Sequence, residues 1–171
     1  MKKSKAYFIA QAAIIAALYV VLTMFINAFN LANGAIQVRI SEALTILPFF
    51  TPAAIPGLFI GCLLSNILTG ALIWDVIFGS IATLLGATGT YLIGRMKHPS
   101  QNVTRFLTPI PPIVANTIIV PLILTYAYQI PGGLVFFMLT VGAGEVLSCG
   151  VLGLILLFAL ARYRHILFPA D

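Results

Sequence analysis

Three acidic residues and one arginine stand inside or at the edge of apolar stretches, away from the basic clusters of the chain: Arg39, Glu42, Asp75 and Glu145. Arg39 and Glu42 are three positions apart, and residues with this spacing share one face of a helix. Charged groups near hydrocarbon are costly, so they usually face a protein interior or a cavity and often mark function. These four residues are therefore candidates for binding chemistry. The alternative is an Arg39–Glu42 ion pair that only stabilises the start of a helix.

The composition indicates what surrounds the folded chain. Hydrophobic residues make up 61% of the 171 positions and charged residues only 8%, about a third of the charged share of an ordinary soluble domain. A soluble core of this size cannot hide so much apolar side chain, so most of the surface must face lipid. We expect an all-α integral membrane protein with a single membrane domain.

Hydropathy and proline positions divide the chain into six apolar segments, at about 6–29, 39–50, 54–71, 75–94, 108–129 and 134–161. The second and third are separated because one helix over residues 40–73 would be about 50 Å long, too long for one span. Pro48, Pro52 and Pro56 also interrupt this run. The pattern predicts a hairpin with its turn at residues 50–52.

The basic residues test this segment count. With six segments, both termini and the loop between the fourth and fifth segments lie on one side of the membrane, together with eight of the nine Lys and Arg residues. Only Arg39 lies on the other side. The positive-inside rule then predicts a six-transmembrane-helix bundle with cytoplasmic N- and C-termini. It also explains the net charge of +5 without a nucleic-acid partner.

The same topology gathers polar residues in the outer half of the membrane. Glu42 begins the second segment and Asp75 the fourth, whereas Glu145 lies roughly 16 Å from the outer end of the sixth. Asn116 lies in the fifth segment, which also contains Pro121. Because proline has no backbone N–H, Pro121 leaves a nearby helix carbonyl without its hydrogen bond. Helices interrupted in this way often build transport sites. A kink beside a satisfied asparagine explains that pattern equally well. If these polar residues have a functional role, the membrane segments that carry them can converge on one outward-facing pocket.

The first segment carries two pairs of alanines spaced by four residues, Ala12 with Ala16 and Ala13 with Ala17. Small residues with this spacing let a second helix approach closely in a membrane. They indicate either packing within the chain's own bundle or a docking face for another membrane subunit.

Several catalytic motifs are absent from the sequence. It contains no Gly-x-x-x-x-Gly-Lys-Ser/Thr phosphate loop, no His-Glu-x-x-His zinc motif and no Gly-x-Ser-x-Gly elbow. The three acids in the outer half can bind a metal only if the fold brings them together, and the nearby Arg39 argues against it. We therefore expect no enzyme, no metal and no cofactor in this chain. A small binding subunit that borrows a motor fits six segments without a visible repeat.

Three stretches together resemble one family: Arg39-Ile-Ser-Glu-Ala-Leu-Thr-Ile-Leu-Pro48, Pro56-Gly-Leu-Phe-Ile-Gly61 and Trp74-Asp-Val-Ile-Phe-Gly-Ser80. The chain is similar to the QueT family of substrate-binding S components of energy-coupling-factor (ECF) transporters, which are taken to import queuosine precursors. The resemblance runs from the alanine-rich first segment to Gly144-Glu145, and the Arg-x-x-Glu-Ala-Leu stretch is its most specific part.

The resemblance implies six helices, a substrate pocket near the outer face and a lid formed by the loop after the first helix. It also implies partners: an EcfT-type transmembrane coupling subunit and two cytoplasmic ATPases that use ATP and Mg. In such S components an alanine motif of the first helix docks the coupling subunit, and either Ala12 with Ala16 or Ala13 with Ala17 matches it. Transport is then expected to occur by toppling of the S component in the bilayer.

A deazaguanine ligand suits the candidate residues. One carboxylate, from Glu145 or Glu42, can accept the two adjacent N–H donors of its pyrimidine edge, and Asn116 can pair with the remaining edge. Trp74 or Phe49 can stack on the ring, while Arg39 can donate to its carbonyl or clamp Glu42. With Asp75, these are the predicted substrate-binding residues. An S component for another vitamin-like solute and a structural or channel-forming membrane protein remain the alternatives.

Overall fold

The computed structural model describes residues 5–28, 39–96 and 101–168, and every regular element in these ranges is helical. Four helical stretches are long and apolar enough to cross a membrane, and they are Lys5–Ala28, Asp75–Arg95, Asn102–Tyr126 and Leu134–Arg162. The prediction of an all-helical, multi-pass membrane protein is therefore confirmed. The predicted lid loop, residues 29–38, lies outside the described residues.

The long stretches are built from the following elements. The first is α1 (Lys5–Ala28), and the second joins η2 (Asp75–Gly79) to α3 (Ser80–Arg95). The third joins α4 (Gln101–Leu107) to α5 (Ile110–Tyr126). The fourth joins α6 (Leu134–Glu145), η3 (Val146–Leu152) and α7 (Gly153–Arg162), and a short helix α8 (Arg164–Leu167) follows it. Residues 101–107 were expected to lie in a basic loop, and the structure corrects this to a helix. Arg105 of α4 lies 5.7 Å above the Phe158 ring of α7, a contact between distant residues that local composition cannot reveal.

Two shorter helices form the predicted hairpin. They are η1 (Ile40–Phe49), a 3₁₀ helix, and α2 (Ala54–Leu68), and the Thr51 amide donates to the Leu47 carbonyl (3.1 Å) in the turn between them. Each is only about 20 Å long at the rise of its helix type, against about 30 Å of hydrocarbon. The six segments are therefore all helical, but only four have the length of a full span.

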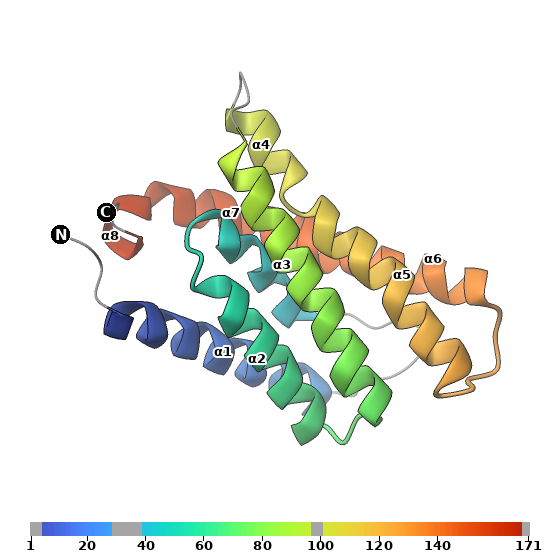
Figure 1. Cartoon of the computed structure of the whole chain (residues 1–171). Helices are drawn as coiled ribbons and strands as arrows, with labels where there is room; N and C mark the ends of the chain where they lie inside the picture. Colours follow the sequence, from blue (N-terminus) through green and yellow to red (C-terminus); the bar gives the residue numbers. More distant parts are fainter. Residues whose placement is uncertain (1–4, 29–38, 97–100, 169–171) are drawn as a thin grey trace.

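The shortest segment, η1, lies at the centre of the molecule. Every residue from Ser41 to Pro48 is buried, and Figure 1 shows this helix in cyan among α1, α3 and α7, which all contact it. Residues three apart eclipse one another in a 3₁₀ helix, and the Thr45 hydroxyl donates to the Glu42 carbonyl (2.6 Å). The apolar residues of η1 thus carry a carboxylate into the core.

Glycines allow the long helices to pack closely. In Figure 1, α1 and α2 lie side by side, and a Cβ on Gly57 would lie 2.7 Å from the Ala12 carbonyl oxygen. On α3, a Cβ on Gly86 would lie 2.6 Å from the Cα atom of Pro112 in α5. Such contacts admit only glycine without backbone movement, so packing within the bundle accounts for the position of Ala12 on α1.

Two helices widen beside an acidic residue. Residues Asp75–Gly79 and Val146–Leu152 form π-helical turns, and Glu145 immediately precedes the second. Wide turns of this kind occur frequently at functional sites because they redirect side chains that a regular helix would place elsewhere. Sequence periodicity assumes regular helices and did not predict them.

The two ends of the molecule differ in charge. The starts and ends of several elements meet at one end, where the Tyr7 hydroxyl lies 3.5 Å from the Leu167 carbonyl and the rings of Phe50 and Phe168 stack at 5.1 Å. Figure 1 shows the start of α1 and α8 together at this end. Since α1, α3 and α7 each begin or finish there with a basic residue, the described cations other than Arg39 collect at it.

Candidate ligand-binding site

A polar cavity of about 380 Å³ opens at the opposite end of the molecule. The last turns of α1 and α2, the turn before η2 and the chain following α5 form its walls. Its principal polar lining residues are Tyr19, Thr23, Arg39, Asn66, Asp75 and Tyr128. The predicted pocket away from the basic end is therefore present.

Local sequence explains how two walls face the cavity. Tyr19, Thr23 and Asn27 follow one another at a spacing of four on α1, so they share one face. At the other wall, α2 ends and the chain turns at Gly70, whose φ of +72° favours glycine. This turn returns the chain to Asp75 at the cavity.

Asp75 is buried beside the cavity with few strong contacts. One carboxylate oxygen lies 3.6 Å from an Arg39 nitrogen and accepts a long hydrogen bond (3.4 Å) from the Tyr128 hydroxyl. Its other oxygen is buried and has no hydrogen-bond partner among the described residues. Buried charges normally require fuller compensation. Asp75 therefore retains capacity to accept another donor.

Tyr128 lies beyond α5, at the rim of the cavity. Burial raises the pKa of its phenol above the usual value, and the charge of Asp75 raises it further. The hydroxyl accepts the Leu72 amide (3.1 Å) while it donates to Asp75. It therefore stays protonated and acts as a donor at the rim.

Glu42 lies below the cavity and is fully buried. Its carboxylate accepts hydrogen bonds from the Tyr19 hydroxyl of α1, from Thr83 of α3 (3.3 Å) and from the Asn116 amide of α5 (3.5 Å). Three helices thus supply donors to one acid on η1. Tyr19 also lines the cavity, so its side chain separates the cavity from this carboxylate.

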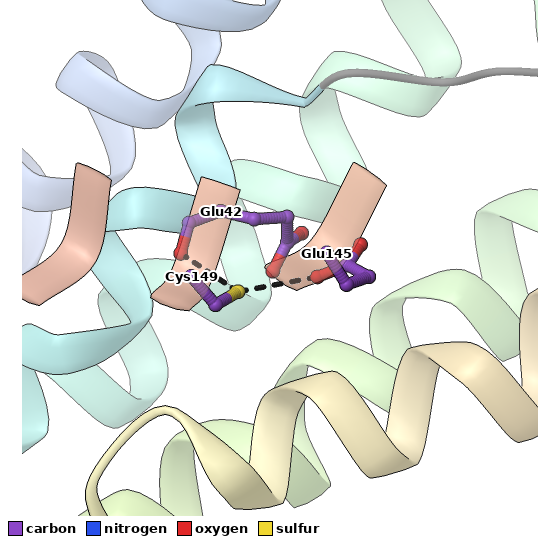
Figure 2. Close-up of side chains that lie close together, drawn as sticks. All are labelled: Glu42, Glu145 and Cys149. Carbon is purple, nitrogen blue, oxygen red and sulfur yellow. Dashed lines mark hydrogen bonds between the residues drawn. The ribbon is translucent and has the colours of Figure 1, made fainter. Parts of the chain in front are cut away.

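Glu145 completes the group below the cavity. Figure 2 shows the Glu42 and Glu145 side chains pointing toward one another, with Cys149 beside them. The Cys149 thiol lies 3.1 Å from a Glu145 carboxylate oxygen and 3.4 Å from the Glu42 carbonyl, with geometry for donation to either. A carboxylate pair of this kind can accept adjacent N–H groups from a ligand.

These three residues also have the types of metal ligands, and their donor atoms lie within 4.8 Å of one another. A metal-bound cysteine is a thiolate, whereas the Cys149 sulfur here has two acceptor oxygens around it and fits a protonated thiol. The arrangement therefore fits hydrogen bonding better than coordination, and the expected lack of a metal stays a prediction.

Most predicted substrate-binding residues meet in this region, on two levels. Arg39 and Asp75 line the cavity, whereas Glu42, Asn116 and Glu145 form the buried group below it. Arg39 forms an ion pair with Asp75 at 3.6 Å, because η2 approaches Arg39 from a distant part of the chain. The predicted clamp of Arg39 on Glu42 stays a prediction.

The two aromatic residues predicted to stack on a ligand lie elsewhere. Trp74 is 51% exposed, stacks on Phe78 (centroids 6.1 Å apart) and lines a separate apolar groove. Phe49 packs at the basic end, where a Cβ on Gly94 would lie 3.0 Å from its ring. The structure therefore does not support stacking by either residue.

Sequence reasoning missed Tyr19, Asn66, Thr83 and Tyr128. The spacing of Tyr19 with Thr23 along α1 was an available signal, because it forms a polar stripe in an apolar helix. For Tyr128, which approaches only through the chain beyond α5, sequence spacing offered no comparable signal.

The two alanine pairs of α1 face different surroundings. Ala12 and Ala16 contact α2 through Gly57 and Gly61, whereas Ala17 is exposed. Ala13 is exposed as well. Internal packing thus accounts for the first pair and leaves the second available.

Comparisons with known proteins point to one family. The family model for the QueT transporter matches residues 9–162. The curated "Queuosine precursor transporter QueT" of Lactococcus lactis subsp. cremoris (strain MG1363) is 44% identical over 99 residues, which cover 57% of this chain and 58% of that protein. No solved structure matches the chain. Since the family model covers nearly all of the described helices, the chain belongs to the QueT transporter family.

Proposed function

We propose that the chain is the substrate-binding S component of an ECF-type importer in a bacterial cytoplasmic membrane. Its ligand is a queuosine precursor, a 7-deazaguanine base or nucleoside taken up from outside. The observation that carries this proposal is the polar cavity of about 380 Å³ above two buried carboxylates in a member of the QueT transporter family. The name of the Lactococcus relative supports the ligand class.

The ligand ring would occupy the cavity and reach the buried acids. The pyrimidine edge of deazaguanine presents two adjacent N–H donors, which match one carboxylate in a bidentate pair. Glu42 or Glu145 would accept them after the Tyr19 side chain moves aside, and Asn116 would bond the neighbouring edge. The position of Tyr19 between the cavity and Glu42 supports this route.

The cytoplasmic placement of both termini is part of the proposal. The gathering of the described basic residues at one end, with Arg39 alone at the other, supports it through the positive-inside rule. The cavity then opens to the outside.

Transport would require partners because this chain lacks a phosphate-binding loop. An EcfT-type coupling subunit would dock on the exposed alanines Ala13 and Ala17, and two cytoplasmic ATPases would supply the energy from ATP with Mg. ATP hydrolysis would drive toppling of the S component, which carries the ligand across the bilayer.

Binding by the purified chain tests the ligand assignment. A ligand that binds only the folded state stabilises it, by about 2.7 kcal/mol at a hundredfold excess over Kd. We expect thermal stabilisation by 7-deazaguanines and none by unrelated vitamins. Stabilisation by a vitamin alone would point to another solute, and no stabilisation by any deazaguanine would refute the ligand assignment.

A substitution on α1 tests the docking surface. Ala17→Leu adds bulk to an exposed position and is expected to abolish co-purification with the coupling subunit while ligand binding persists. Val21→Leu, at another exposed position of α1, is the matched control and should retain co-purification. Equal co-purification of both variants would show that this face does not dock the partner.

A further inference from the structure

An apolar groove lies on the surface of the bundle, behind one wall of the polar cavity. It measures about 480 Å³, and aromatic and aliphatic side chains line it: Trp74, Phe78, Ile119, Leu122, Ile123, Tyr126 and Ala127. We propose that this groove binds one acyl chain of a phospholipid, in the leaflet on the side of the cavity. The proposed function does not use this surface, so the two proposals stand or fall separately.

The groove begins at the level of the lipid headgroups. Trp74 immediately precedes the span that starts at Asp75, and Tyr126 is the last residue of the span that starts at Asn102. These two aromatic side chains are 51% and 71% exposed. Trp and Tyr collect where hydrocarbon meets the headgroups, because their rings are apolar and their tips are polar. Both residues therefore mark the membrane interface at the cavity end of the molecule.

The dimensions of the groove fit a lipid chain. From Tyr126 it follows α5 inward to Ile119, a length of about 10 Å at the rise of an α-helix, whereas one leaflet of hydrocarbon is about 15 Å thick. Over this length the volume gives a mean cross-section of about 45 Å², roughly half that of a helix with its side chains. The groove is therefore too narrow for a helix of a second copy and has the length of the upper part of an acyl chain.

The lining also favours a flexible apolar occupant. Water needs two to four polar partners, and these side chains present mainly hydrocarbon and ring surface. An unfilled groove forfeits dispersion contacts with its walls. Because lipid tails are as apolar as the helices, packing decides what fills such a hollow. An acyl chain can lie along the stacked rings of Trp74 and Phe78, whose centroids are 6.1 Å apart.

The groove and the polar cavity share one wall. Three residues of the groove are each followed directly by a residue of the cavity: Trp74 by Asp75, Ile123 by Leu124 and Ala127 by Tyr128. The same backbone therefore has the cavity on one side and lipid on the other. In Figure 1 the helices that carry the groove, α3 with the preceding η2 and α5, lie side by side. A bound acyl chain completes the lipid side of this wall.

Fluorescence can detect the lipid at this site. Trp74 is the only tryptophan of the sequence, so intrinsic tryptophan emission reports on this groove. The purified chain in detergent is titrated with phosphatidylcholine that carries bromine on the upper half of one acyl chain, since bromine quenches tryptophan on contact. Unbrominated phosphatidylcholine is the reference at each point.

A binding site and random contact predict different titrations. Random contact quenches in proportion to the brominated fraction of the amphiphiles. A tenfold preference for the groove, equal to about 1.4 kcal/mol, gives about half of the maximal quenching when about one tenth of the amphiphiles are brominated. Proportional quenching overturns the proposal. Absent quenching also overturns it, and a dimer in the same sample would then identify a second copy as the occupant.

A matched pair of variants tests whether the lipid lies in this groove. Leu122→Phe adds a ring to the groove, and the quenching at one tenth brominated lipid is expected to fall about fivefold, to the value for random contact. Leu85→Phe makes the same exchange at a 54% exposed position of α3 outside the groove and should keep the wild-type curve. Ile119→Phe replaces Leu122→Phe if that variant does not fold. Equal curves for the groove variant and Leu85→Phe overturn the assignment to this groove.

Discussion

The acid at the cavity and the acid in the buried group below it differ in how fully their carboxylates are hydrogen-bonded. Glu42 accepts side-chain donors from three separate helices and is fully buried. Asp75 has only long contacts and keeps one oxygen without a partner among the described residues. The two carboxylates are similar in sequence context and in burial, yet one is satisfied by the protein and the other is not.

We propose that this difference separates a structural role from a binding role. A carboxylate that holds several helices together contributes to the fold, because its loss leaves each donor unpaired in a buried site. A carboxylate with unfilled capacity contributes little to the fold and is available to a ligand. Substitutions in the buried group should therefore reduce stability more than ligand binding. Substitutions at the cavity should reduce ligand binding more than stability.

Glu42→Ala should have the largest effect on stability. It leaves the donors on Tyr19 and Asn116 without this acceptor, whereas the Thr83 hydroxyl keeps the Gly79 carbonyl at 3.2 Å. Breaking such a buried network costs about 3–5 kcal/mol. The measurement is denaturant or thermal unfolding of the purified protein in detergent. Glu42→Gln, which keeps the shape and one acceptor oxygen, should lose less. A loss below about 1 kcal/mol in Glu42→Ala would remove the distinction between the two levels.

Tyr19→Phe should have an intermediate effect on stability, because the Tyr19 hydroxyl connects the cavity to the buried group below it. The variant loses one hydrogen bond to a buried acid, at a cost of about 1.5–3 kcal/mol in unfolding free energy. The ring that lines the cavity remains. Leu18→Phe, at an exposed neighbouring position, controls for aromatic bulk on α1. If Tyr19→Phe unfolds like the wild type, the contact between Tyr19 and Glu42 carries no stability.

Tyr128→Phe should have the smallest effect on stability. Its hydroxyl bonds Asp75 at 3.4 Å and the Leu72 amide at 3.1 Å, both at the rim, where water can replace it. We expect a change of at most about 1 kcal/mol in unfolding free energy together with weaker ligand binding, measured on the same preparation. A stability loss as large as that of Glu42→Ala would show that the rim is structural.

Much of the architecture was predictable because membrane folds obey simple constraints. Hydrophobic length and proline positions located all six helical segments and the turn near Thr51. The segregation of basic residues predicted the charge difference between the two ends, and the stretch from Arg39 to Pro48 indicated the family, which the family model confirms. These properties follow from residue type and order alone.

Other features depended on approach between distant segments. The ion pair of Arg39 with Asp75 joins residues 36 positions apart in the sequence. The exposure of Trp74, which stacks on Phe78, is likewise a property of the folded chain. The helix at residues 101–107 contacts α7 through Arg105 and Phe158. Periodicity describes one helix at a time, so it cannot supply these relations.

The sequence by itself predicted that the chain lies in a membrane, that Glu42, Asp75 and Glu145 lie in the half away from every basic residue except Arg39, and that a short proline-bounded segment carries Glu42. Only the tertiary structure decided which acid is satisfied and which remains available. The reason is physical: hydropathy is a sum over residues, whereas hydrogen-bond satisfaction requires donors from several helices to meet one oxygen within about 3 Å. In this protein that meeting occurs at Glu42 and remains incomplete at Asp75.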